Sequence, residues 1–144
     1  MKTCVLDASI ATKWFYEEAM SKEADALLVN IQEAQLKAVV PEFFYLEMAN
    51  MFWSQHRKRN TSAIGVNELF DKLRKVELEV HRELELSQLA LFYALQLGIT
   101  VYDSLYLVLA ESLNIPFLTA DHGIMRASEK AGFKFVQSLE EFCA

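Results

Sequence analysis

Short apolar runs alternate along this chain with longer segments whose apolar residues recur at helical spacing. The short runs have the length and composition of strands and lie at residues 3–6, 38–40, 76–80, 115–119 and 134–136. The segments between them are typical of helices, at residues 8–16, 21–36, 41–59, 62–74, 85–97, 101–113, 121–131 and from 138 onward. Alternation of this kind predicts an α/β fold with a mostly parallel sheet and helices on both faces.

The length of the chain suits one domain. With 144 residues it can bury a sizeable core, and we expect residues 1–144 to form a single domain. Its hydrophobic content of 53% is somewhat above the globular norm, which leaves apolar surface for an oligomer interface. Only four Gly and two Pro are present, so we expect no long linkers.

The amino terminus shows no secretory signal peptide, because it passes directly into the first strand-like run. Nowhere do 18 uncharged apolar residues follow one another. We therefore expect a cytoplasmic protein with no membrane contact. The two cysteines, Cys4 and Cys143, lie far apart and form no CxxC pair, which argues against a structural zinc site.

Four acidic residues interrupt or end apolar stretches: Asp7 in VLDAS, Glu47 in FFYLEMAN, Asp103 in TVYDSLYL and Asp121 in LTADHG. An ionised carboxylate in such surroundings is costly unless a cation compensates it. Mg²⁺ and Mn²⁺ prefer carboxylate and water oxygens, and a cluster of such ligands is typical of phosphate chemistry. The four acids therefore indicate a metal-dependent nuclease.

The predicted sheet would bring these acids together. Ligands of open parallel sheets bind outside the carboxyl ends of the strands, and Asp7 and Asp121 follow two of the expected strands. Glu47 and Asp103 fall in the first halves of helices that would lie beside the same edge. We therefore expect all four to converge on one pocket.

Most of these acids also have a purely structural interpretation. Asp7 and Asp121 precede helices and could act as N-caps, while Asp103 is the third helical residue of a capping box. Glu47 does not fit this alternative. It is the only charged residue in the segment 43–53 and lies in mid-helix among apolar neighbours.

The formal charge of −6 is unusual for a protein that binds nucleic acid. The basic residues are unevenly placed, however: residues 55–82 carry a net charge of +3 and the rest of the chain carries −9. Within that segment, Arg57, Lys58 and Arg59 are candidate RNA contacts. The same cluster is also typical of a solvated helix end, where cations complement the helix dipole.

Other phosphate chemistries lack their motifs. No GxGxxG or GxxxxGK[ST] is present, so we expect no dinucleotide or P-loop site. Phosphatases with an aspartyl nucleophile need a second Asp two residues after a strand-end acid such as Asp7, and Ser9 occupies that position. None of the three histidines lies in a nucleophile motif. His122, beside Asp121, is either an exposed loop residue or a substrate contact.

Three stretches resemble a known family. LDASIATKWF, PEFFYLEMANMFW and TVYDSLYLVLAESLNIPFLTADHGI are similar, in order and spacing, to the successive motifs of PIN-domain ribonucleases, especially the VapC toxins of toxin–antitoxin pairs. By that resemblance the acidic quartet of the family corresponds to Asp7, Glu47, Asp103 and Asp121. Ser9 and Thr119 match hydroxyl positions that hold or extend the metal shell.

The resemblance implies a three-layer α/β/α sandwich, Mg²⁺ or Mn²⁺ at the four carboxylates and endonucleolytic cleavage of RNA. It also implies a small antitoxin protein as partner, and a homodimer. An alternative from a different class is a PIN-like module that mainly binds a protein partner and has weak or no nuclease activity. The apolar helix at residues 43–53 would serve such a surface, although packing in the core also explains it.

Overall fold

Five parallel strands form the central sheet of the computed structural model, in the order β3-β2-β1-β4-β5. They are β1 (Lys2–Leu6), β2 (Leu36–Pro41), β3 (Glu79–His81), β4 (Phe117–Leu118) and β5 (Val136–Gln137). The structure describes residues 1–143, so Ala144, the last residue of the expected domain, lies outside the described part.

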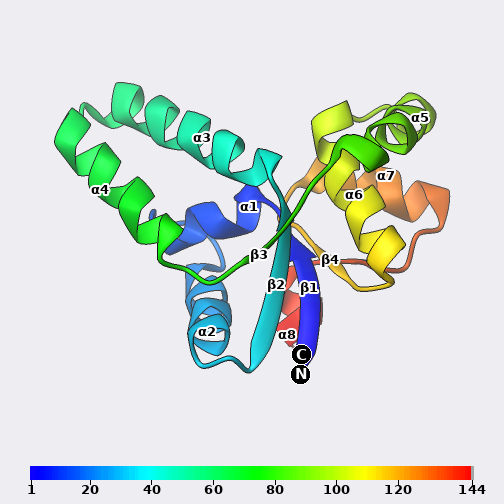
Figure 1. Cartoon of the computed structure of the whole chain (residues 1–144), viewed down its shortest axis with the longest axis horizontal. Helices are drawn as coiled ribbons and strands as arrows, with labels where there is room; N and C mark the ends of the chain where they lie inside the picture. The colour runs from blue at the N-terminus through cyan, green and yellow to red at the C-terminus, as the bar shows by residue number, and fades with distance from the viewer. Residues whose placement is uncertain (144) are drawn as a thin grey trace.

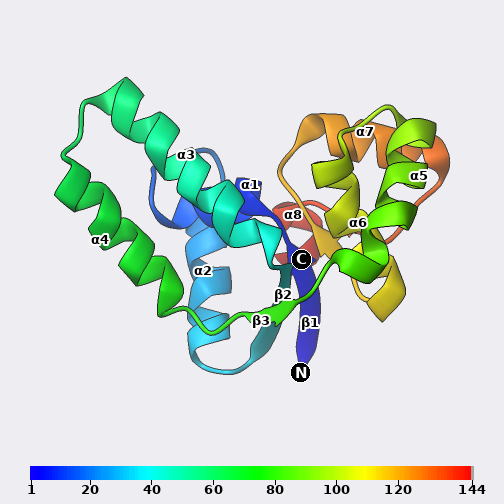
Figure 2. The same ribbon diagram turned by 45° about the horizontal axis from the view of Figure 1, so that its top comes forward.

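Helices cover both faces of the sheet, which Figure 1 shows almost edge-on. One layer holds α1 (Ala8–Ala11), the 3-10 turn η1 (Thr12–Trp14), α2 (Ser21–Gln32), α3 (Phe43–Arg59), α4 (Ala63–Arg74) and α8 (Leu139–Cys143). The other layer holds η2 (Leu84–Leu86), α5 (Ser87–Leu97), α6 (Val101–Leu113) and α7 (His122–Ala131). Figure 2 shows the same two groups of helices on either side of the strands. The predicted three-layer α/β/α sandwich is therefore confirmed.

The winding of the chain reverses between β1 and β4. From β1 the chain proceeds outward through β2 to β3, and it then returns to the other side of β1 to add β4 and β5. Open parallel sheets bind ligands at the carboxyl ends of the strands where such a reversal occurs. Asp7 directly follows β1 and Thr119 directly follows β4, so both lie at this position.

Helix α6 connects the core to the site. All its residues from Ser104 to Ala110 are buried, and it packs on β1, β2 and β4. The ring of Tyr106 stacks on that of Phe117, with 5.9 Å between centroids and 10° between planes. Because interiors are densely packed, this contact places the second turn of α6 relative to the start of β4.

The boundary between α2 and β2 differs from the prediction. The helix that was expected to reach Leu36 ends at Gln32. Ala34 has a left-handed backbone, with φ of 58°, and the Gln35 N–H donates to the Asn30 carbonyl at 2.8 Å. This turn redirects the chain, and Leu36 begins β2.

The start of α3 also differs from the prediction. Pro41 ends β2 and does not open the helix, because the Glu42 N–H donates to the His81 carbonyl at 3.0 Å and extends the pairing with β3. The helix begins at Phe43, whose N–H donates to Glu83 Oε2 at 3.0 Å. A distant side chain thus satisfies this helix start.

No single helix in residues 1–143 is long and apolar enough to cross a membrane. The helices Leu84–Leu97 and Val101–Leu113 meet those criteria only when they are counted together, and the chain bends by 114° between them.

Candidate active site

Asp7 is the buried centre of the candidate site, with 5% of its surface exposed. It follows β1 and caps α1: its Oδ1 accepts hydrogen bonds from the Ser9 backbone N–H at 3.1 Å and from the Ser9 hydroxyl at 2.5 Å. Its Oδ2 accepts a hydrogen bond from the Thr119 hydroxyl at 2.6 Å. The carboxylate therefore joins the ends of β1 and β4.

The same two hydroxyls hold the loop after β4. Ser9 Oγ accepts the Ala120 N–H at 2.9 Å, and Thr119 Oγ1 accepts the Asp121 N–H at 3.1 Å. Each hydroxyl thus donates to Asp7 and accepts from the loop backbone. The position of Asp121 relative to Asp7 follows from these bonds.

Asp121 is an exposed residue that caps α7. Its Oδ1 accepts the Ile124 N–H at 2.9 Å. A Cβ atom on Gly123 would lie 3.1 Å from that oxygen, so a larger residue there would crowd the carboxylate. The N-cap interpretation is geometrically correct for both Asp7 and Asp121, but capping occupies only one oxygen of Asp121.

Glu47 lies in the second turn of α3 and is partly buried. Its Oε1 accepts a hydrogen bond from the Tyr106 hydroxyl at 2.5 Å. Tyr106 is fully buried, and its stacking on Phe117 fixes the direction of its hydroxyl. Two helices from opposite layers thus meet through this bond.

Asp103 stands in the first turn of α6, where Thr100 Oγ1 caps the helix and accepts the Asp103 N–H at 3.1 Å. Asp103 and Glu47 line a cleft of about 650 Å³ between α3 and α6. Phe43 and Tyr102 also line this cleft, and their rings stack with centroids 4.7 Å apart. The carboxylates are therefore accessible to a ligand from this side.

The four carboxylates affect one another. Burial raises the pKa of Asp7 to about 7, and the charges of Glu47 and Asp103 raise it while the two hydroxyls lower it. Burial raises the pKa of Glu47, and the charges of Asp103 and Asp121 add to that rise. The pKa of Asp103 is raised by burial and then by Asp121. None of the four has a Lys, Arg or His ion-pair partner within residues 1–143.

The acids do not form a closed cage. Within residues 1–143, no group of three or more acidic, His or Cys side chains has an arrangement that could hold a metal ion. Both oxygens of Asp7 accept hydroxyl hydrogen bonds, and one oxygen of Asp121 accepts from its own helix. Because uncompensated carboxylates repel each other, an open ring is the arrangement that their charges favour.

The basic cluster lies away from these acids. It occupies the last turn of α3 and comprises Arg57, Lys58 and Arg59. The guanidinium of Arg57 lies over the Trp53 ring at 5.1 Å and that of Arg59 over the Tyr16 ring at 5.0 Å. Arg57 follows Glu47 by ten positions, roughly 15 Å along the helix axis. The structure therefore does not bring this cluster to the carboxylates.

Sequence reasoning missed Tyr106. Its signal was a single tyrosine within the otherwise apolar run from Leu105 to Ala110. A buried tyrosine hydroxyl usually has a hydrogen-bond partner. The sequence could not show that this partner is Glu47, 59 residues earlier.

Comparison with known proteins identifies the family. Residues 4–130 match the PIN domain family. The chain belongs to the PIN-domain family. It is 29% identical over 119 residues to "Ribonuclease VapC3" from Pyrobaculum aerophilum, and the match covers 81% of this chain and 88% of that protein. The family predicted from the motifs is thus confirmed.

A solved structure of similar fold is the crystal structure of PAE2754 from Pyrobaculum aerophilum. The TM-score is 0.73 at 18% sequence identity, and the match covers 98% of this chain and 86% of that chain. The two chains therefore share one fold over nearly the whole length of this chain.

The raised pKa of Asp7 predicts a pH-dependent stability. A carboxyl whose pKa is higher in the folded than in the unfolded state stabilises the protein at low pH, and this stabilisation is lost as the pH rises through about 7. We expect Asp7→Asn to remove that loss, so that in EDTA at pH 8 its melting temperature exceeds that of the unmodified protein by roughly 5 °C. Thermal melts between pH 4 and pH 8 measure this. Parallel curves for the two proteins would contradict the assignment.

The bond between Tyr106 and Glu47 is tested by Tyr106→Phe, which keeps the ring stacked on Phe117. A hydrogen bond to a charged group contributes about 1.5–3 kcal/mol, so at pH 8 we expect a loss of roughly 5 °C in melting temperature. The loss should shrink at lower pH, because a protonated Glu47 is a weaker acceptor. Tyr102→Phe on the same helix is the matched control, since that tyrosine is exposed. Equal effects of both variants would argue against this bond.

Proposed function

We propose that this protein is an endoribonuclease that requires Mg²⁺ or Mn²⁺ and acts as the toxin of a VapBC-type toxin–antitoxin pair. One observation carries the proposal: a buried aspartate stands where the sheet reverses, three further carboxylates are close enough to affect one another, and no cation within residues 1–143 is paired with them. The relative from Pyrobaculum aerophilum is named a ribonuclease, which supports RNA as the substrate.

The four acids suit a hard divalent cation, because their donor atoms are carboxylate oxygens and their charge is uncompensated. Asp7, Asp103, Asp121 and Glu47 would be the residues that hold the ion. A bound Mg²⁺ or Mn²⁺ would supply positive charge against the phosphate and activate water for attack. Ser9 and Thr119 would keep Asp7 in place while this happens.

Glu47 has a further role in this proposal. It lines the open cleft, its pKa is raised chiefly by burial, and Tyr106 fixes one of its oxygens. A carboxylate with a raised pKa accepts a proton more readily near neutral pH. Glu47 would therefore orient the attacking water and take its proton, or complete the metal shell.

The basic cluster of Arg57, Lys58 and Arg59 remains a candidate for RNA binding at a distance from the reacting phosphate. These side chains are exposed at the end of α3. A strand of RNA that left the cleft along α3 would reach them, and their charge would compensate phosphates outside the site. Their contacts with aromatic rings also fit a solvated helix end, as the sequence indicated.

Partner binding is supported by exposed apolar side chains. Helix α5 presents Leu89, Phe92 and Leu95 at intervals of three residues, each at least 41% exposed. Helix α3 is mainly a core helix, with only Leu46 and Trp53 as large exposed apolar residues. An antitoxin and a second copy of this chain are the partners that we propose for such surfaces. A cytoplasmic location remains a prediction.

We expect RNA cleavage to require Mg²⁺ or Mn²⁺ and to stop with EDTA. Asp7→Asn, Asp103→Asn and Glu47→Gln should each lower the rate at least about 100-fold, because each removes charge that holds the metal. Asp25→Asn, on the exposed side of α2, is the matched control. Cleavage of a mixed RNA pool by the purified proteins provides the measurement.

Two other results would count against this function. Undiminished cleavage by all three variants would mean that the acidic site is not the catalytic site. A protein that cleaves no RNA with either metal, yet binds a partner protein, would favour the protein-binding alternative.

Metal binding should also be visible in stability. Mn²⁺ at about 100 times its dissociation constant should stabilise the unmodified protein by about 2.7 kcal/mol, through preferential binding to the folded state. In EDTA, Asp103→Asn should be at least as stable as the unmodified protein, because it relieves repulsion, and in Mn²⁺ it should gain less. Thermal melts of both proteins in the two conditions decide this. A destabilised variant, together with no response to Mn²⁺ in either protein, would mean that Asp103 only supports its helix.

A further inference from the structure

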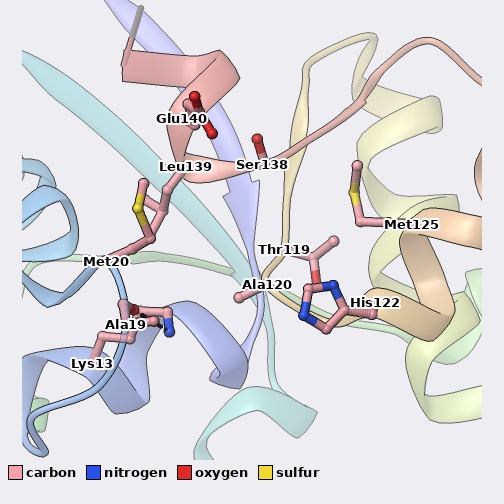
Figure 3. A pocket seen from close by; sticks show the side chains of 10 residues that line it. All are labelled: Lys13, Ala19, Met20, Thr119, Ala120, His122, Met125, Ser138, Leu139 and Glu140. Carbon is pink, nitrogen blue, oxygen red and sulfur yellow. Dashed lines mark hydrogen bonds between the residues drawn. The ribbon is translucent and has the colours of Figure 1, made fainter.

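A second hollow lies next to the acidic site, on the other side of Thr119. This pocket, of about 190 Å³, is bordered by the η1 turn and the loop after it, the start of α7 and the start of α8. Its lining residues are Lys13, Ala19, Met20, Thr119, Ala120, His122, Met125, Ser138, Leu139 and Glu140 (Figure 3). Because Thr119 lines this pocket and also donates to Asp7, a ligand in it would lie next to the carboxylates.

Lys13 is the lysine that lines this pocket, and it forms an ion pair with Glu18. Its side chain is only 9% exposed, and its ammonium group donates to the Ala19 carbonyl at 2.8 Å and contacts Glu18 Oε1 at 3.4 Å. An ammonium group has three N–H donors, and these contacts use two of them. Figure 3 shows the end of Lys13 turned toward the pocket. The third donor is therefore available to an anion there.

The opposite wall adds features that favour an anion. Figure 3 shows the ring of His122 facing the pocket across from Lys13, and His122 is the first residue of the ten-residue helix α7. The start of a helix carries partial positive charge, of which the Asp121 carboxylate uses one N–H donor, that of Ile124. Glu140 lies at the other end of the pocket (Figure 3), away from these two residues. One end of the pocket is thus suited to a phosphate.

The remainder of the pocket is mostly apolar. Figure 3 places Met20 and Met125 on opposite sides of the pocket, with Leu139 beside Met20 and Ala120 below them in the view. Methionine side chains adapt to flat ligands and make favourable contacts with aromatic rings. The volume is below the roughly 300–1,000 Å³ of pockets that hold drug-sized ligands. A single planar base is the kind of group that fits.

We propose that this pocket binds one unpaired nucleotide of the RNA substrate, adjacent to the phosphodiester at the acidic site, with its phosphate at Lys13 and His122 and its base between Met20 and Met125. The proposal rests on the proposed nuclease function and adds a substrate position to it. Bases are available for such contacts only where RNA is single-stranded. The pocket therefore selects for an unpaired position next to the cut.

Two variants test the charge and the space separately. Lys13→Met keeps the aliphatic stem and removes the ammonium group. Ala19→Phe adds a ring at an exposed position that borders the pocket and leaves the acidic site unchanged. Lys75→Met, an exposed lysine after α4, is the matched control for the charge.

Affinity is measured with a fluorescent, unstructured ten-nucleotide RNA in Ca²⁺, where little turnover is expected. Lys13→Met should weaken binding roughly tenfold at 0.1 M salt and reduce the salt slope by about 1, as expected when one phosphate contact is lost. Ala19→Phe should weaken binding without a change in slope, because it removes no charge. Neither variant should alter the rise in melting temperature that Mn²⁺ produces. A variant that lacks this rise has a folding defect, and its loss of RNA affinity would not count as support.

An abasic RNA shows whether a base occupies the pocket. Two substrates are needed, one without the base of the nucleotide before the cleaved bond and one without the base of the nucleotide after it. At one of these positions the effect of Ala19→Phe on KM should disappear, because the ring then has no base to displace. Persistence of the full effect at both positions would overturn the base assignment.

The two levels of the proposal fail in different ways. If the unmodified protein neither binds nor cleaves RNA, the nuclease function itself is wrong. If it cleaves RNA, and Lys13→Met and Ala19→Phe retain its affinity and salt slope, the nuclease stands and the nucleotide pocket is refuted. If these variants lose only the binding of an acidic peptide, the pocket is a protein contact and the nucleotide proposal is equally refuted.

Discussion

The hydrogen bond between Asp7 and Thr119 is the interaction on which the site depends. It joins the carboxyl ends of β1 and β4, the two strands between which the sheet reverses. Parallel strands do not by themselves align the loops that follow them. Here the carboxylate of one strand end and the hydroxyl of the other do so, and Thr119 also receives the Asp121 N–H. The position of one catalytic candidate thus determines that of another.

The burial of Asp7 has an energetic cost that the fold must offset, and the hydrogen bonds from Ser9 and Thr119 reduce it. Asp7 is buried, and its pKa rises to about 7 in spite of two hydroxyl donors. The neighbouring carboxylates increase this strain, because no cation is paired with them. The all-parallel sheet and the buried helix α6 supply the rigidity that keeps the acids near one another. Under the proposed function, such a site would exchange stability for the capacity to bind a cation.

The sequence predicted the order of strands and helices, because apolar periodicity and capping residues are local signals. It also proposed the four acids as site residues, Glu47 among them because a carboxylate in mid-helix cannot act as a cap, and this assignment stays a prediction. It did not predict contacts between distant residues: Pro41 remains in β2 because His81 pairs with the residue after it, and Tyr106 donates to Glu47 across the layers. Local patterns therefore identify the acids, whereas only the fold shows what holds them in place.

The cleft between α3 and α6 and the pocket beyond Thr119 differ in charge, so they would receive different parts of a bound ligand. The cleft between α3 and α6 contains Glu47 and Asp103, whereas the pocket beyond Thr119 contains Lys13. Without a bound metal, a polyanion would be repelled by the two carboxylates of the cleft, whereas in the pocket one N–H donor of Lys13 is available to it and Glu140 lies at the other end. Contacts in the pocket and a metal ion at the acids would then contribute separately to the affinity for RNA. Both would be needed to bring a phosphodiester to Asp7. The net charge of −6 is compatible with RNA cleavage for this reason, since the positive charge is required only locally.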